Sequence, residues 1–167
     1  LKHGYKGKLF PINPTAKTIS GLQCFESARN IPQAVDHAFI MLPRELVTDA
    51  LLSCADLGIK CATILADGYS EAGCEGQSYQ AALSKTAQDL NIRLLGPNSI
   101  GIINPQAGVA LSANAMLELP GFTQGRTGVI SQSGSLIGAI LSHGEARHIG
   151  YSKLISVGNE ADLSVGE

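Results

Sequence analysis

Three serines and a glycine stand together in the segment Ser131-Gln132-Ser133-Gly134-Ser135, where a predicted strand gives way to an apolar helical pattern. The first turn of a helix carries unpaired backbone amides and the positive end of the helix dipole, and both favour an anion. Because a phosphate is the natural ligand of such a turn, Ser131, Ser133 and Gly134 are candidate phosphate-binding residues. The alternative is that one serine only caps the helix.

Other signatures of catalysis are missing from the sequence. A nucleophile elbow needs Gly-x-Ser-x-Gly, whereas Ser133 has a serine two residues before it and another two residues after it. Neither the P-loop pattern nor a G-x-G-x-x-G turn occurs, which excludes a P-loop nucleoside triphosphatase. The four histidines have no acid or serine arranged as a triad, so we interpret them as structural or surface residues. We assign no catalytic residue to this chain.

A second candidate for anion binding is Lys17. It closes the turn Asn13-Pro14-Thr15-Ala16-Lys17, which follows a short apolar run that we predict as a strand. An ammonium group at that position could place a point charge on a phosphate. The alternative is an ordinary turn with a solvated lysine.

The cysteines do not predict a metal site. No two of the four form the C-x-x-C pair that is typical of zinc sites, and three lie within or beside apolar patterns. We therefore expect buried, reduced thiols in a cytoplasmic protein and no metal ligands.

Strands and helices alternate along the sequence around these candidate residues. We predict strands over 9–12, 35–42, 61–66 and 93–95, and helices over 43–58 and 77–90, with a glycine-rich loop over 67–76. Apolar strands joined by amphipathic helices are typical of an α/β protein with a doubly wound parallel sheet. Such sheets bind ligands beyond the carboxyl ends of their strands, so four loops should converge on one edge, those after Ile12, Leu42, Ala66 and Leu95.

The pattern changes after Gly96. Residues 104–125 look irregular, and a strand over 128–131, a helix and a strand over 151–157 then form a βαβ unit that is too small to be a complete domain. We therefore expect a domain over 1–115, a linker over 116–127 and the start of a second domain over 128–167. Leu1 is no start methionine and the last residues close no element, so we interpret the chain as an internal fragment.

Composition excludes two classes of partner. Twelve Lys and Arg residues against fourteen Asp and Glu residues give a formal charge of -2 with no basic block, and the chain has no Trp, which argues against nucleic-acid binding. The apolar runs are far shorter than the roughly 20 residues that a membrane span needs, so we expect no contact with a membrane.

Four segments, taken in order, resemble the NDP-forming acyl-CoA synthetases, relatives of the succinyl-CoA synthetase alpha subunit. The segments are Lys8-Leu9-Phe10-Pro11-Ile12-Asn13-Pro14, Ile92-Arg93-Leu94-Leu95-Gly96-Pro97-Asn98-Ser99-Ile100-Gly101, Val129-Ile130-Ser131-Gln132-Ser133-Gly134 and Ser156-Val157-Gly158-Asn159-Glu160-Ala161-Asp162. The resemblance covers nearly the whole chain. It implies a Rossmann-like CoA-binding domain, truncated at its N-terminus, followed by the first βαβ unit of a flavodoxin-like ligase domain.

The resemblance also implies roles for single residues. Pro14 and Lys17 match the loop that lies against the phosphates of coenzyme A, while Pro43 and Gly68 line the same edge and Asn98 falls near the thiol. Residues of the second unit match the turn that holds a phosphate, and these are Ser131, Ser133 and Gly134.

In this family an acyl phosphate is exchanged with coenzyme A, and a histidine carries the phosphoryl group to a nucleoside diphosphate. No histidine here matches that carrier, since His143 lies within the apolar helix pattern. The resemblance places ATP or ADP, Mg²⁺ and an ATP-grasp domain or subunit in the longer parent protein, so this chain alone should be inactive. It leaves the acyl group, the nucleotide and homo-oligomer formation open.

Two other functions remain open at this point. The same N-terminal region resembles that of protein lysine acetyltransferases, where it senses acyl-CoA. The third hypothesis is a non-catalytic CoA-binding module.

Overall fold

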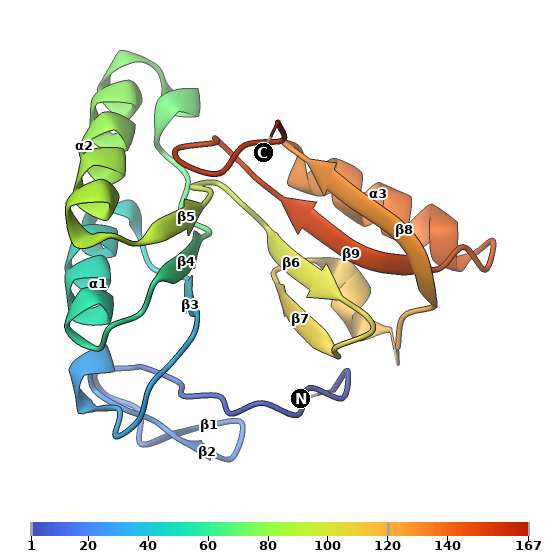
Figure 1. Cartoon of the computed structure of the whole chain (residues 1–167), viewed down its shortest axis with the longest axis horizontal. Coiled ribbons are helices and arrows are strands. Elements are labelled where there is room, and N and C mark those ends of the chain that lie inside the picture. The colour runs from blue at the N-terminus through green and yellow to red at the C-terminus, as the bar shows by residue number, and fades with distance from the viewer. Residues whose placement is uncertain (1, 120, 167) are drawn as a thin grey trace.

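The computed structural model describes residues 2–119 and 121–166 (Figure 1). Its helices are α1 (Arg44–Asp56), α2 (Cys74–Leu90) and α3 (Gly134–Glu145), with short 3-10 turns η1 (Ala28–Asn30), η2 (Ser70–Ala72) and η3 (Ala115–Glu118). Its strands are β1 (Thr18–Ile19), β2 (Leu22–Gln23), β3 (Ala38–Ile40), β4 (Cys61–Ile64), β5 (Arg93–Leu95), β6 (Gly101–Asn104), β7 (Val109–Ser112), β8 (Gln124–Ser131) and β9 (Tyr151–Ser156).

The first sheet is parallel, in the order β3-β4-β5, and α1 and α2 pack against it. Helix α1 buries Val47, Leu51 and Cys54, which recur at intervals of three and four residues along one helical face. They meet Ile64 of β4 and Leu94 of β5, both fully buried. Burying each large aliphatic side chain contributes about 1.5–3 kcal/mol, so this core holds the sheet and both helices together.

The second sheet is mixed, in the order β7-β6-β9-β8. Strands β8 and β9 are parallel and are joined by α3, whereas β6 is antiparallel to both β7 and β9. Its core packs Ile137 and Leu141 of α3 against Leu154 of β9 and Ile103 of β6. The α/β class, the parallel sheet and the βαβ unit expected from the sequence are therefore confirmed.

Several predicted elements differ from the observed ones. Residues 9–12 form no strand. They make one isolated bridge, between Ile12 and Phe25, and they do not pair with the sheet β3-β4-β5. Helix α2 begins at Cys74, three residues before the predicted start, and β3 is shorter than predicted. Strand β8 begins at Gln124, within the stretch predicted as a linker.

Residues 104–125 are also more ordered than predicted. They contain β7 and η3, and β7 has every residue half-buried, so the period-2 alternation that marks a strand is missing there. Strand β6 of the same hairpin is hydrogen-bonded to β9. The division into domains over 1–115 and 128–167 stays a prediction.

Among the described residues, no helix is long and apolar enough to cross a membrane.

Candidate functional site

The carboxyl ends of β3, β4 and β5 open into three loops. Pro43 stands directly before α1, Gly68 lies in the loop after β4, and Asn98 follows β5. Nη1 of Arg44 donates a hydrogen bond to the carbonyl of Gly68, which ties the first loop to the second. The amide of Asn98 donates to the carbonyl of Ala66 over 2.8 Å, which ties the third loop to the second. The structure thus brings Pro43, Gly68 and Asn98 to one edge of the sheet.

The loop after β4 is held by side chains on both of its flanks. Gly68 has φ +84°, a conformation that side-chain-bearing residues rarely adopt, and a Cβ there would lie 3.3 Å from Nη1 of Arg44. The amides of Gly68 and Tyr69 donate to Oε1 of Glu71 over 2.5 and 3.2 Å. The Arg44 guanidinium in turn stacks on the ring of Tyr79, 3.9 Å from its centroid. The loop is therefore built around one anion and one cation.

Two ionisable groups in this loop have shifted pKa values. Burial acts to raise the pKa of Glu71, but hydrogen bonds from Asn159 and from backbone amides, including those of Gly68 and Tyr69, outweigh it and hold the pKa below its ordinary range. Burial raises the pKa of Tyr69 to about 12. At neutral pH Glu71 is therefore a carboxylate, whereas the phenol of Tyr69 is neutral and buried in the core.

A segment from the second sheet completes this edge. After β9 the chain runs beside β5, with the amide of Asn159 donating to the carbonyl of Pro97 over 2.8 Å and the amide of Ala161 donating to Gly96 over 3.0 Å. The side chain of Asn159 bonds to Glu71, Gln80 and Asn98. Sequence reasoning gave no role to Glu71, Gln80 or Asn159. The only signal was that Asn159 lies in a segment that carries the family resemblance.

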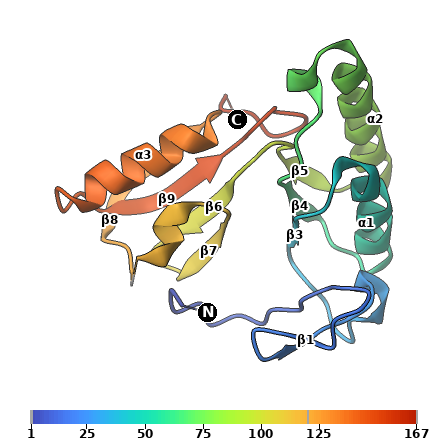
Figure 2. The same cartoon turned by 180° about the vertical axis from the view of Figure 1, so that it is seen from behind.

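Pro14 and Lys17 lie elsewhere. The carbonyl of Lys17 accepts a 2.9 Å hydrogen bond from Cys24 at the base of the β1–β2 hairpin, and Oδ1 of Asn13 accepts from the amides of Thr15 and Ala16. Figures 1 and 2 both show this hairpin at the bottom of the molecule, whereas the loops that follow β4 and β5 lie in the upper half. The expectation that the loop after Ile12 converges with the other three was wrong, because residues 9–12 are not part of their sheet.

The serine turn between β8 and α3 is closed by its own hydrogen bonds. Oγ of Ser133 accepts from the amide of Leu136 over 3.3 Å and so caps α3, as the alternative interpretation expected. Oγ of Ser131 accepts from the amide of Ser133 over 3.1 Å. A Cβ on Gly134 would lie 2.6 Å from Cγ2 of Ile100, so this glycine permits the helix to pack closely on Ile100.

The serine turn and Asn98 lie at opposite ends of one short segment. The amide of Val157 donates to the carbonyl of Ser131 over 2.9 Å, and two residues later Asn159 bonds to Pro97 and Asn98. Figure 1 shows the arrowheads of β8 and β9 directed toward the side on which β5 ends. The two sites predicted separately from the sequence are therefore linked through residues 157–159.

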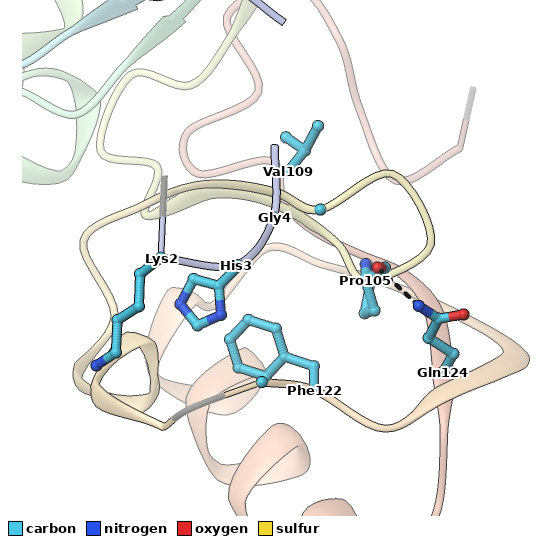
Figure 3. A pocket seen from close by; sticks show the side chains of 9 residues that line it. Lys2, His3, Gly4, Pro105, Val109, Phe122 and Gln124 are labelled. Atoms are coloured by element: carbon cyan, nitrogen blue, oxygen red, sulfur yellow. Dashed lines mark hydrogen bonds between the residues drawn. The ribbon is translucent and has the colours of Figure 1, made fainter. Parts of the chain in front are cut away.

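A cavity of about 330 Å³ lies away from both sites, between the N-terminal residues and the segment around Phe122 (Figure 3). The His3 ring stacks on Phe122 with centroids 4.5 Å apart, and its Nε2 lies 3.1 Å from the carbonyl of Leu117. None of the candidate site residues lines this cavity.

The expectation of buried thiols holds for Cys54 alone, since Cys24 and Cys61 are half-buried. Cys54 is buried, which raises the pKa of its thiol to about 11, although Cys74 is exposed. His143 lies on α3, as the apolar pattern predicted. In the described part of the chain, no group of three or more His, Cys, Asp or Glu side chains could hold a metal ion.

Comparison with known proteins accounts for both regions. Residues 1–105 match the model of the CoA binding domain, and residues 124–167 match that of the succinyl-CoA ligase like flavodoxin domain. The chain is 35% identical to acetate–CoA ligase [ADP-forming] II of Archaeoglobus fulgidus, over 97% of this chain and 24% of that protein. It is 34% identical to the alpha subunit of the corresponding Pyrococcus furiosus ligase, over 100% of this chain and 35% of that subunit.

Solved structures agree. An acetyl-coenzyme A synthetase from Ca. Korarchaeum cryptofilum, solved with phosphate and ADP, superposes with a TM-score of 0.90 at 33% identity, over 98% of this chain and 34% of that one. A Pyrococcus horikoshii protein superposes with a TM-score of 0.92 at 33% identity, over 99% of this chain and 37% of that one. The chain therefore spans about a third or less of these relatives, and it belongs to the NDP-forming acyl-CoA synthetase family through its CoA-binding domain and the adjoining flavodoxin-like segment.

Proposed function

We propose that this chain is the CoA-binding part of an NDP-forming acyl-CoA synthetase in which coenzyme A exchanges with an acyl phosphate. The observation that carries this proposal is the link between Asn98 and the Ser131 turn through residues 157–159. A reaction between a thiol and an acyl phosphate needs both groups at one place. The hydrogen bonds that join the two candidate sites through residues 157–159 support this proposal.

The chemistry follows from the two sites. The sulfur of the CoA thiol attacks the acyl carbonyl, the bond from that carbon to the phosphate oxygen breaks, and the thiol proton passes to the phosphate, which leaves as the hydrogen phosphate anion. The first turn of α3 offers backbone amides and the helix dipole to that anion. Ser131, Ser133 and Gly134 shape the turn, and Ser133 fixes its geometry by capping the helix.

Coenzyme A would lie extended along the first unit. Pro43 and Gly68 would line its path along the carboxyl edge, and Asn98 would stand near the thiol. Pro14 and Lys17 would meet the phosphates at the nucleotide end. Figures 1 and 2 show the β1–β2 hairpin at the bottom of the molecule and the loops after β4 and β5 in its upper half, which supports an extended ligand.

Phosphoryl transfer to the nucleotide would take place on other parts of the enzyme. Mg²⁺ and ATP or ADP would bind an ATP-grasp domain or subunit, and a histidine outside the segments described here would carry the phosphoryl group. His143 lies on α3, with its Nδ1 3.3 Å from Nη1 of Arg147, so it does not occupy a free loop. Such an enzyme would work in the cytoplasm.

Calorimetric titration of the chain with coenzyme A tests this function. Wild-type chain should bind CoA, and Lys17→Ala should weaken binding by about 1–3 kcal/mol, because a charge-assisted contact to phosphate is lost. Lys153→Ala, an exposed lysine of β9, is the matched control and should leave the affinity unchanged. An unchanged affinity in Lys17→Ala would remove this lysine from the site, and a wild-type chain that does not bind CoA would contradict the proposal.

A further inference from the structure

Asn159 joins the second sheet to the loops at the carboxyl edge of the first sheet by hydrogen bonds. It lies three residues beyond the end of β9, yet its side chain reaches three separate elements. Its Nδ2 donates to the carboxylate of Glu71 in the loop after β4 and, over 3.2 Å, to Oε1 of Gln80 on α2. Its Oδ1 accepts a 3.3 Å hydrogen bond from Nδ2 of Asn98.

The orientation of this amide is fixed by its partners. A carboxylate can only accept hydrogen bonds, so the Asn159 nitrogen must face Glu71 and its oxygen must face Asn98. The main chain is also bonded on both sides, since its amide donates to Pro97 over 2.8 Å and its carbonyl accepts from Nε2 of Gln80 over 3.1 Å. Every polar group of Asn159 is therefore used, and Asn98 has a single defined partner on this side.

The backbone at Gly158 lies close against the backbone of the loop after β5. Gly158 has φ +61°, and a Cβ there would clash with the carbonyl oxygen of Pro97. Glycine at this position therefore lets the chain lie against the loop after β5 and delivers the next side chain into it. The charge at this point is equally defined, because Glu71 is ionised at neutral pH and also holds the amides of Gly68 and Tyr69.

We infer that Asn159 is a positioning residue for the thiol half of coenzyme A. It holds the Asn98 side chain and the loop carrying Gly68 in one arrangement. Asn159 belongs to the segment 157–159, whose first residue is hydrogen-bonded to the Ser131 turn. This inference rests on the proposed function, which places the thiol near Asn98 and the nucleotide near Lys17. Asn159 acts through these neighbours and does not itself touch the reacting atoms.

Two ligands separate this role from a general effect on folding. Coenzyme A carries the pantetheine arm and thiol, whereas adenosine 3′,5′-bisphosphate keeps only nucleotide and phosphates. Calorimetry on Asn159→Ala should show CoA affinity reduced about tenfold, as expected when one or two hydrogen bonds that order the site are lost. Affinity for the bisphosphate should stay within about twofold. Asn104→Ala, which removes a side-chain bond to the amide of Ala107 in the β6–β7 turn, should change neither affinity.

A rescue experiment tests the pairing itself. Asn159→Asp places a second carboxylate beside Glu71 and should weaken CoA at least as much as the alanine variant. Adding Glu71→Gln restores a hydrogen bond between the two positions, with position 71 now the donor and position 159 the acceptor. The amide oxygen at position 71 can still accept from the amides of Gly68 and Tyr69. The double variant should regain most of the CoA affinity that Asn159→Asp loses, short of the wild-type value because the bond from Asn159 to Gln80 is not restored.

The outcomes separate the two hypotheses. Equal losses for both ligands in Asn159→Ala, or no rescue in a double variant with the wild-type melting temperature, would overturn the positioning role while leaving CoA binding intact. A wild-type chain that binds neither ligand would overturn the proposed function and this inference with it.

Discussion

Nε of Arg93 donates a 2.8 Å hydrogen bond to Oδ2 of Asp162, and the amide of the neighbouring Leu94 donates to the same oxygen over 2.7 Å. Arg93 and Leu94 belong to β5 of the first sheet, whereas Asp162 follows β9 of the second. Oγ of Ser84 on α2 adds a 2.9 Å bond to the carbonyl of Ala161. The segment that carries Asn159 is therefore fixed after that residue by these bonds and before it by the bond from Val157 to Ser131.

Replacing Asp162 should destabilise the chain in a graded way. Asp162→Ala leaves the amide of the fully buried Leu94 without its acceptor and should cost about 1–3 kcal/mol. Asp162→Asn keeps an acceptor oxygen and should cost less. Asp56→Ala, which breaks the exposed pair with Arg29, is the control and should cost about 0–1 kcal/mol. Urea unfolding measures all three, and equal costs for the two Asp162 variants would show that the Leu94 bond contributes nothing.

The same carboxylate should make stability depend on acid pH. Burial acts to raise the pKa of Asp162, but hydrogen bonds from Arg93 and Leu94 and the Arg93 charge outweigh it and lower the pKa. The unfolded chain then binds a proton more readily, so this contribution is complete above the ordinary carboxyl pKa of about 4. It is lost as the pH falls through the lower pKa of the folded state. Thermal melts from pH 6 downward should show a shallower decline for Asp162→Asn than for wild type, and parallel curves would contradict this.

Gly134 should tolerate no side chain. Gly134→Ala places a Cβ 2.6 Å from Cγ2 of Ile100 and should destabilise the chain by about 1–3 kcal/mol through overpacking. Adding Ile100→Ala removes the clashing atoms and should recover part of the loss. Gly128→Ala is the matched control, because its Cβ would make only an ordinary 3.7 Å contact with Oγ of Ser152. Calorimetric melting of these variants checks the ranking, and an innocuous Gly134→Ala would refute the packing role.

Ser133 allows the cap and the phosphate site to be tested separately. Ser133→Ala removes the hydroxyl that accepts from Leu136 and should cost about 1 kcal/mol of stability. Ser133→Asp keeps a good cap, so its melting temperature should stay near that of wild type, but its charge should repel an anion. Titration with inorganic phosphate followed by phosphorus NMR should show binding to wild type and none to Ser133→Asp. Equal phosphate binding by both proteins would remove this turn from the site, and CoA affinity should be unchanged throughout.

Elements whose signals are local could be predicted from the sequence alone. The apolar period of α1, the continuous apolar run of β4 and the strand-serine-helix pattern before α3 each follow from neighbours along the chain, and all three are present in the fold. The same patterns predicted that the loops after Leu42, Ala66 and Leu95 share one edge, because parallel strands joined by helices must end at the same side. The four segments that resemble the NDP-forming acyl-CoA synthetases also identified the family from the sequence.

The contacts that join these elements are visible only in the folded molecule. The β6–β7 hairpin belongs with β9, and nothing local marks it, since β7 is half-buried along its whole length. Residues 9–12 lack the pairing that would make them a strand, so the turn that carries Lys17 does not follow a strand of the β3-β4-β5 sheet. Asn159 meets Glu71 across 88 positions of the chain. Hydrogen bonds between polar side chains on irregular segments leave no periodic trace in a sequence, so the residues that link the two sites were found only in the folded molecule.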